Sequence, residues 1–364
     1  MKLQLFLSLF CLPALYIPAS HAQTTIPFDS PRWTIKADSA VRETYQGRPC
    51  LKLTNGTAVL KDAHFTNGII EYKMFLQPAR YFPGIRFRMP DTDNGEIYYL
   101  RPHQSGNPDA MQYYPEYHGS GGWQLYYGKG FGNAHKLPFD RWLRIKILVS
   151  GSRAEVYFDE EKEPVLYIRQ LKRPIAEGMI ALDNSWPVPV RYADVSYTPM
   201  DSVALLNKPD PEPALPASVF RSWQVSAPFD EARLPAGALS SRDTTSLSWQ
   251  TLGVDERGVA DLSILAGAVP GKNTVFVRQV IESDRPQIKR LSFGFSDRVH
   301  VYLNGKLLYT GEDNFLSRDY RFLGTIGYYD ALYLDLAKGR SELWMALSED
   351  MGGWGVQAKL EDMP

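Results

Sequence analysis

The stretch WLRIKILVSGSRAEVYFDEEKEPVLYI, Trp142 to Ile168, decides the fold class. Every second residue from Leu143 to Val149 is aliphatic, and Arg144 and Lys146 lie between them. This period of two is typical of a β-strand with one buried face. Ser150-Gly151-Ser152 then predicts a turn, and the alternation resumes after it. The stretch therefore predicts an antiparallel hairpin.

The same alternation continues along most of the chain, and convincing helical periodicity is nearly absent. In the second half, Asn304-Gly305 between two strand-like runs predicts a two-residue hairpin turn. We therefore expect an all-β protein made of two β-sandwich (jelly-roll) domains joined by a Pro-rich linker.

The segment before the strands predicts export. Residues 1–22 combine Lys2, an apolar run and the small-x-small exit Ser20-His21-Ala22, which is the pattern of a cleaved signal peptide. The apolar run is short and broken by prolines, so no membrane span is expected in the mature protein. The predicted location is secreted or periplasmic.

About 340 residues remain after cleavage. A single hydrophobic core rarely organises a chain of this length, so two domains are expected. Residues 199–218 hold five prolines and predict an extended linker. The expected domains are therefore residues 23–198 and 219–364. The formal net charge of −1 argues against a nucleic-acid partner, and the sequence does not predict an oligomeric state. Cys50, the single cysteine left after cleavage, is expected to be buried.

The stretch from Tyr98 to Gly128 has an unusual composition for a core. It contains seven tyrosines and Trp123 but few aliphatic residues, and cores are built mainly from Leu, Ile, Val and Phe. Aromatic faces stack on the apolar faces of sugar rings, and arginine and amide groups bind hydroxyls. The stretch therefore predicts a surface for sugar-like ligands.

Alternation assigns side chains to faces. In GIRFRM, residues 84–89, a core row of Ile85, Phe87 and Met89 would leave Arg86 and Arg88 on the opposite face.

In EIYYLRPH, residues 96–103, burying Tyr98 and Leu100 directs the alternate side chains outward. If the two strands are neighbours, their outward side chains share one face. The predicted ligand-binding residues are Arg86, Arg88, Tyr99, Arg101, His103, Gln104, Gln112, Trp123 and Gln124.

Residues 33–197 resemble the concanavalin A-like lectin/glucanase sandwich, in the branch of the 3-keto-disaccharide hydrolase (glycoside hydrolase family 16-like) domains. The resemblance lies in NGIIEYKMFL, FPGIRFRMPDTDNGEIYYLRPH, GWQLYYG, FDRWLRIKILVSGSRAEVYFD and EGMIALDNS. From Phe220 onward, RVHVYLNGKLLYTG, LDLAKGRSELWMAL and GGWGVQAKL resemble galactose-binding-like jelly rolls. Both resemblances imply carbohydrate, an oligo- or polysaccharide, as partner, with glycans on the concave face of the first sandwich.

The resemblance also raises catalysis. A family 16 glycosidase carries two carboxylates on one strand in a Glu-x-Asp-x-x-Glu run, and this chain has no such run. Glu96, Asp109 and Glu116 are the candidate acids or bases. Asp91 and Asp93 first predict a turn, and they also offer oxygen ligands for a structural Ca²⁺, without the closing glutamate of a twelve-residue loop. No other cofactor is expected.

Three hypotheses follow for function. The first is an exported carbohydrate-binding protein, and the second is a glycoside hydrolase of the same fold. The second hypothesis includes, as a variant, a polysaccharide lyase with Tyr99 or His103 as base. The residue types fit that chemistry, but no motif matches. The third hypothesis is a structural or adhesion protein. Convergent carboxylates would favour a hydrolase, and a groove with aromatic residues alone would favour binding.

Overall fold

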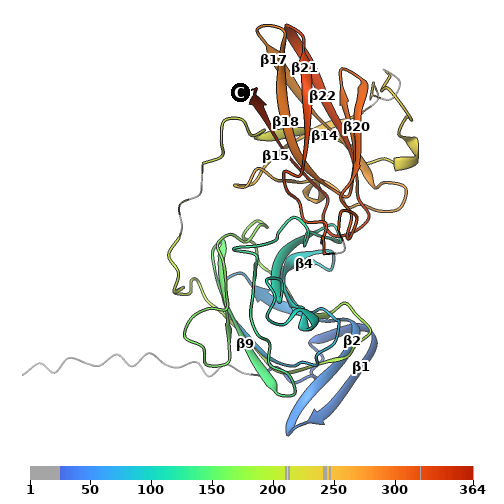
Figure 1. Cartoon of the computed structure of the whole chain (residues 1–364). Helices are drawn as coiled ribbons and strands as arrows, with labels where there is room; N and C mark the ends of the chain where they lie inside the picture. The colour runs from blue at the N-terminus through green and yellow to red at the C-terminus, as the bar shows by residue number, and fades with distance from the viewer. Residues whose placement is uncertain are drawn as a thin grey trace, which may run out of the picture.

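The computed structural model describes residues 25–363 except 210, 212, 213, 241–243, 246 and 320. The predicted signal peptide, residues 1–22, lies outside the described residues. The described chain consists of strands, loops and short helical turns, and it folds into two β-sandwich domains (Figure 1). This confirms the predicted fold class. In the part of the chain described, no helix has the length and apolar character needed to cross a bilayer.

The N-terminal domain is built on one antiparallel sheet of 13 strands, in the order β11-β10-β9-β3-β13-β2-β12-β4-β5-β6-β7, with β1 beside β2 and β8 beside β6. The sheet curls over so that its halves enclose one core (Figure 1). The aliphatic row from Leu143 to Val149 is fully buried in that core, as its alternation predicts. The strands are β1 (Trp33–Tyr45), β2 (Arg48–Phe65), β3 (Gly68–Phe75), β4 (Pro83–Asp91), β5 (Asn94–Leu100), β6 (Met111–Tyr117), β7 (Ser120–Gly121), β8 (Gly132–Asn133), β9 (Trp142–Ser150), β10 (Arg153–Phe158), β11 (Leu166–Ile168), β12 (Gly178–Asn184) and β13 (Val190–Pro199).

The long strand β2 belongs to both halves of this sheet. Along one edge it pairs with β1, while its other edge pairs with β13 near Leu53 and with β12 beyond Gly56. The side chain of Asn184 lies where β12 and β13 diverge, and its Nδ2 donates to the carbonyl oxygens of Leu53 and Val188. This buried amide therefore satisfies backbone groups that the ladder leaves unpaired.

A β-bulge in β4 overturns part of the face prediction. The pairing of β4 with β5 shifts register between Phe87 and Asp91, and Arg88 has a φ of +50°. Ile85 and Phe87 lie in the core as expected, but Met89 packs outside it in a separate small cluster. Arg88 is buried instead: between the pairs Arg86–Ala181 and Met89–Met179, β4 has one more residue than β12, and this reverses the alternation after Phe87. The prediction that Arg88 shares a face with Arg86 is wrong.

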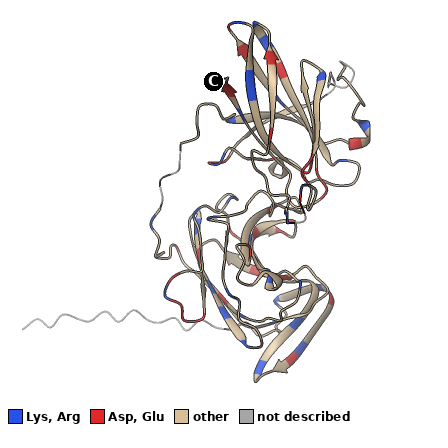
Figure 2. Ribbon diagram, in the orientation of Figure 1, with Lys and Arg blue, Asp and Glu red and all other residues tan. Residues whose placement is uncertain are grey.

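The C-terminal domain packs a six-stranded sheet, β15-β14-β17-β22-β19-β20, against a four-stranded sheet, β16-β23-β18-β21. The predicted hairpin at Asn304-Gly305 joins β19 to β20, and both turn residues have positive φ. Figure 2 shows basic and acidic residues mixed along the strands of both domains. The strands are β14 (Ser222–Ser226), β15 (Trp249–Gly253), β16 (Ala260–Asp261), β17 (Thr274–Ser283), β18 (Gln287–Ser296), β19 (Arg298–Leu303), β20 (Lys306–Glu312), β21 (Asp330–Leu336), β22 (Gly339–Ser348) and β23 (Gly355–Asp362).

The two domains contact each other around the loop that follows β7. Gln124 is fully buried there: its Nε2 donates to Leu323 O, and its backbone N–H donates to Gly352 O. A Cβ at Gly352 would lie 2.2 Å from Gln124 Oε1, and the φ of +109° at this position also favours glycine. Tyr126 Oη also donates to Asp261 Oδ2 at 2.9 Å.

An ion pair supports the same contact. Lys172 Nζ of the N-terminal domain lies 2.6 Å from Glu256 Oε2 of the C-terminal domain, and both side chains are largely buried. The part of the linker near Asn207 is fixed to the first domain, because the Glu155 carboxylate accepts hydrogen bonds from Leu206 N and Asn207 N. The domains therefore meet through specific polar contacts.

Candidate functional site

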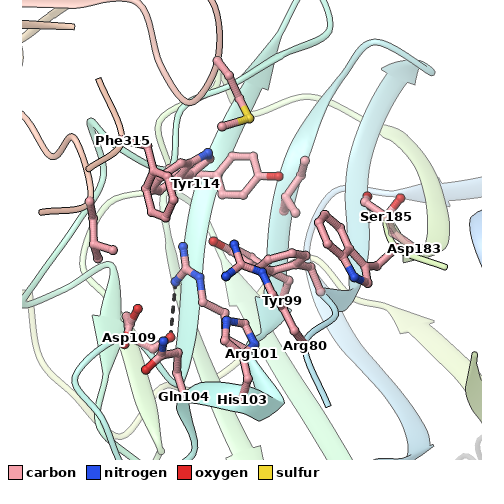
Figure 3. Close-up of a pocket in the computed structure, with 16 residues that line it drawn as sticks. Arg80, Tyr99, Arg101, His103, Gln104, Asp109, Tyr114, Asp183, Ser185 and Phe315 are labelled. Atoms are coloured by element: carbon pink, nitrogen blue, oxygen red, sulfur yellow. Dashed lines mark hydrogen bonds between the residues drawn. The ribbon is translucent and has the colours of Figure 1, made fainter. Parts of the chain in front are cut away.

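A cavity of about 360 Å³ opens between strands of the N-terminal domain and loops of the C-terminal domain. This volume falls in the range of ~300–1,000 Å³ typical of small-ligand pockets. Side chains from β5, β6 and β12 line it, and Phe315, Leu323 and Met351 line it from the C-terminal domain. Figure 3 shows the lining side chains, with Phe315 among those labelled. The remaining lining residues are Arg80, Phe82, Ile97, Tyr99, Arg101, His103, Gln104, Asp109, Tyr114, Trp123, Asp183, Ser185 and Trp186.

Aromatic rings make up much of the cavity wall. Tyr99 contacts Tyr114 edge to face, with ring centroids 5.4 Å apart. Phe82 contacts Trp186 in the same way at 5.3 Å, and Trp123 contacts Phe315 of the other domain at 6.4 Å. Edge-to-face contacts fix the orientation of the rings. The wall is therefore pre-formed and apolar.

Two arginines face this aromatic wall. Arg101 is only 6% exposed, and its guanidinium lies 4.8 Å from the ring centroid of Tyr99 and 5.7 Å from that of Trp123. Arg80 is more exposed and lies 5.8 Å from the ring centroid of Trp186. Both contacts have cation–π geometry, which favours a cation on an aromatic face. They place positive charge against the aromatic wall of the cavity.

A third arginine near the cavity is fully engaged. Arg86 Nε donates to Asp183 Oδ1 at 3.2 Å, and its Nη1 forms an ion pair with Glu116. Ser185 Oγ donates to the second oxygen of Asp183 at 2.9 Å. Burial raises the pKa of Glu116, and the charge of Arg86 opposes that rise. This network holds β4, β6 and β12 together beside the cavity.

His103 and Asp109 complete the polar lining. Burial lowers the pKa of His103, and the positive charges of Arg80 and Arg101 lower it further, so the imidazole is neutral at pH 7. In Figure 3, Arg80 and Arg101 lie between Asp109 on one side and Asp183 with Ser185 on the other. The cavity thus presents cationic, neutral and anionic groups in separate places.

Six of the residues predicted from the sequence line this cavity. Three of them come from the outward face of residues 96–103, and the other three come from the segments before and after β6. They are Tyr99, Arg101, His103, Gln104, Asp109 and Trp123.

Gln112 and Gln124 lie beside the cavity and support its wall. Gln112 accepts a hydrogen bond from Tyr99 Oη at 2.8 Å and donates one to Trp123 O at 2.7 Å, so it positions the Tyr99 ring and the backbone at Trp123. The amide of Gln124 is used in the domain contact. Neither residue lines the cavity, in contrast to the expectation that both would bind hydroxyls directly.

Glu96 and Arg88 face away from the cavity, into the protein. Glu96 is fully buried and accepts hydrogen bonds from Tyr113 Oη at 2.6 Å and from Arg173 N. Arg88 donates to Thr66 O and Gly151 O. Glu116 also does not line the cavity, because Arg86 holds it beside β4. Among the predicted acids, only Asp109 faces the cavity in the described structure.

Asp91 and Asp93 form a turn. Asp91 Oδ1 accepts hydrogen bonds from Asp93 N and from Asn94 Nδ2, both at 2.9 Å. Over the residues that the structure describes, no three or more His, Cys, Asp or Glu side chains gather closely enough to hold a metal ion. A structural Ca²⁺ at this turn stays a hypothesis.

Several lining residues were not predicted. Arg80, Asp183 and Trp186 lie in loops or strand ends far from Tyr98–Gly128 in the sequence. The run LDNSWP, residues 182–187, holds a carboxylate and a tryptophan at the end of a strand, which is a usable signal. Phe315, Leu323 and Met351 carry no such signal, because only the contact between domains brings them to the cavity.

No protein-family model matches this chain, and no curated protein sequence matches it. Solved structures similar to it include a carbohydrate-binding module, CBM66, from Bacillus subtilis, with 14% identity over 46% of this chain and 94% of that one and a TM-score of 0.35. Domain 4 of an extracellular arabinanase from Geobacillus stearothermophilus has 15% identity over 46% and 85%, with a TM-score of 0.29. A glycosyl hydrolase family protein from Mycobacterium fortuitum has 12% identity over 47% and 94%, with a TM-score of 0.31.

Proposed function

We propose that this protein is exported and binds a carbohydrate in the cavity between its two domains. The observation that carries the proposal is the composition of the cavity wall. Aromatic rings from Phe82, Tyr99, Tyr114, Trp123 and Trp186 surround a few charged and amide side chains. Sugar rings present apolar C–H faces and polar hydroxyl edges, and this lining complements both.

Individual side chains suit distinct parts of a sugar. Trp123 and Trp186 are only partly covered by protein and offer ring surface for stacking, and Gln104 and the carboxylate of Asp109 are available for hydroxyl groups. The lining loops are braced by Gln112 and by the domain contact, so little ordering is required when a ligand binds. Export rests on the signal-like pattern of residues 1–22.

A glycoside hydrolase, of the 3-keto-disaccharide type that the sequence resembles, is the second candidate. Two carboxylates, Asp109 and Asp183, line the same cavity, which favours it. Glycosidases use one carboxyl group as acid and another as nucleophile or base. Both oxygens of Asp183 already bind Arg86 or Ser185, however, which reduces its fitness for either role. Binding is therefore preferred over hydrolysis.

A glycan-array screen of the mature protein tests the proposal, with each hit incubated and examined for cleavage products. We expect binding without products, and we expect the Trp123→Ala variant to lose the same hits. Products that disappear in Asp109→Asn would replace binding with hydrolysis. An array without hits, from protein that melts cooperatively, would contradict both candidates.

A further inference from the structure

We propose that the ligand is an acidic sugar, whose carboxylate binds Arg101 and Arg80. This inference rests on the proposed function and adds the chemical class of the sugar. It starts from a difference among the arginines around the cavity. A buried charge is costly unless it has a partner, so a folded protein normally supplies one.

Arg101 lacks a carboxylate partner among the described residues. Its Nη1 donates to the backbone oxygen of Asp109 at 3.2 Å, and that is one of the five N–H donors of a guanidinium. Tyr99 and Trp123 occupy its faces through cation–π contacts. The remaining donors belong to a guanidinium that lines the cavity (Figure 3).

Arg80 provides a second cation at the same place. It forms no ion pair with any described residue, and its guanidinium lies 6.0 Å from the ring centroid of Phe82. The rings of Phe82 and Tyr99 are themselves 6.2 Å apart, so the two guanidinium groups lie over neighbouring rings. Both project into the cavity in Figure 3. Two such groups can bind one carboxylate from two directions.

The chemistry of the guanidinium favours a planar anion. Its parallel N–H groups match the two oxygens of a carboxylate, and such charge-assisted hydrogen bonds are roughly twice as strong as neutral ones. The aromatic wall requires that the anion be attached to a ring that stacks. Asp109 and Asp183, on either side of the arginines, suit the hydroxyls of the same ring. A uronic acid combines these features.

Isothermal titration calorimetry with matched glycosides tests this inference. The probes are methyl β-D-glucuronoside against methyl β-D-glucoside, the corresponding galacto pair, and methyl β-D-glucoside 6-sulfate. We expect one uronoside to bind at least about tenfold more tightly than its neutral partner, because one charge-assisted contact contributes about 1.4 kcal/mol or more. We also expect this preference to weaken as the salt concentration rises.

Two variants locate the preference. Arg101→Gln should reduce the ratio of acidic to neutral affinity to near one, and Arg80→Gln should reduce it in part. Arg80 is exposed, so its variant is expected to fold even if Arg101→Gln does not. Arg141→Gln, at a surface arginine paired with Asp159, serves as the control and should leave the ratio unchanged.

The outcomes separate the two proposals. Equal affinity for acidic and neutral partners would overturn the acidic-sugar inference and leave carbohydrate binding in place. Tighter binding of the 6-sulfate than of the uronoside would show that the anion is not a carboxylate. Absence of binding to every glycoside, together with an array without hits, would overturn carbohydrate binding itself.

Discussion

Arg86 and Arg101 are arginines from neighbouring segments of one sheet, and both are nearly buried, yet their surroundings differ. The side chain of Arg86 is 14% exposed and lies between the carboxylates of Asp183 and Glu116. Arg101 lies between two aromatic rings and binds a single backbone oxygen. The first arrangement has its anions within the fold, and the second is the one that we propose binds an added anion. Comparing partners therefore distinguishes an arginine that holds the fold from one proposed to bind a ligand.

The largest effect expected from this comparison is on stability. Arg86→Gln leaves two carboxylates, Asp183 and Glu116, without their cation in a largely buried place. Removing one partner of a buried ion pair typically costs about 3–5 kcal/mol. We expect the urea midpoint of the N-terminal domain to fall accordingly. A midpoint equal to that of the unmodified protein would mean that the ion pairs of Arg86 do not stabilise the fold.

Asp261, at the contact between the domains, is a buried carboxylate that forms no ion pair with any described residue. Burial raises the pKa of Asp261 from 3.8 to about 6, although Tyr126 Oη and Ser263 N donate to it. The folded state binds this proton more tightly than the unfolded state does. The contribution of Asp261 to the free energy of unfolding is therefore full below about pH 4 and is lost between about pH 4 and 6. The loss amounts to about 2–3 kcal/mol at neutral pH.

Asp261→Asn should remove that loss. We expect the variant to be more stable than the unmodified protein at pH 7.5 and similar to it at pH 4, as measured by denaturant unfolding at both values. A stability difference that is the same at both pH values would mean that Asp261 does not titrate in this range.

A smaller effect concerns the aromatic wall beside Arg101. Trp123→Ala should weaken sugar binding by about 1–2 kcal/mol, the contribution of one stacked ring, without unfolding the domain. Calorimetry and thermal melting measure the two effects on the same sample. Tyr333→Ala, at an aromatic residue of β21 that is 63% exposed, is the matched control. If Trp123→Ala unfolds the domain instead, the ring is part of the core, and Trp123 is not a residue that stacks on the ligand.

The smallest expected effect is the stability change of Arg101→Gln. Because no carboxylate of the described residues pairs with Arg101, its loss leaves none of them without a cation, and we expect a free energy of unfolding within about 1 kcal/mol of that of the unmodified protein. The same substitution is thus expected to have a large effect on stability at residue 86 and a small one at residue 101. A destabilisation as large as that of Arg86→Gln would assign Arg101 a structural role.

Local patterns predicted the strands and most of one cavity wall. Alternation along β9 and the Asn304-Gly305 turn depend on neighbours in the chain, so the sequence contains the information needed. The same holds for Tyr99 and Arg101, which alternate with the buried Tyr98 and Leu100. That alternation also places Glu96 on the core side, and this excludes Glu96 from the cavity without any structure.

What local patterns missed depends on distant or irregular features. The bulge that buries Arg88 interrupts the period of two, and no glycine stands in residues 85–91 of β4 itself to mark it. Asp183 and Met351 reach the cavity through strand pairing and domain contact, which are set by residues far apart in the sequence. For the same reason, the sequence alone could not show that Arg86 pairs with Glu116 while Arg101 bonds only to a backbone oxygen among the described residues.

The strand shared by both halves of the first sheet bears on the order of folding. β1 and β2 are adjacent in the chain and can pair as soon as both are made, but the other edge of β2 pairs with β12 and β13, more than a hundred residues later. Such long loops close slowly, and an open strand edge is a template for association with other chains. A chain synthesised from its N-terminus therefore has an aggregation-prone edge from the completion of β2 until Val190–Pro199 arrives, and a chaperone that covers β2 would act in that interval.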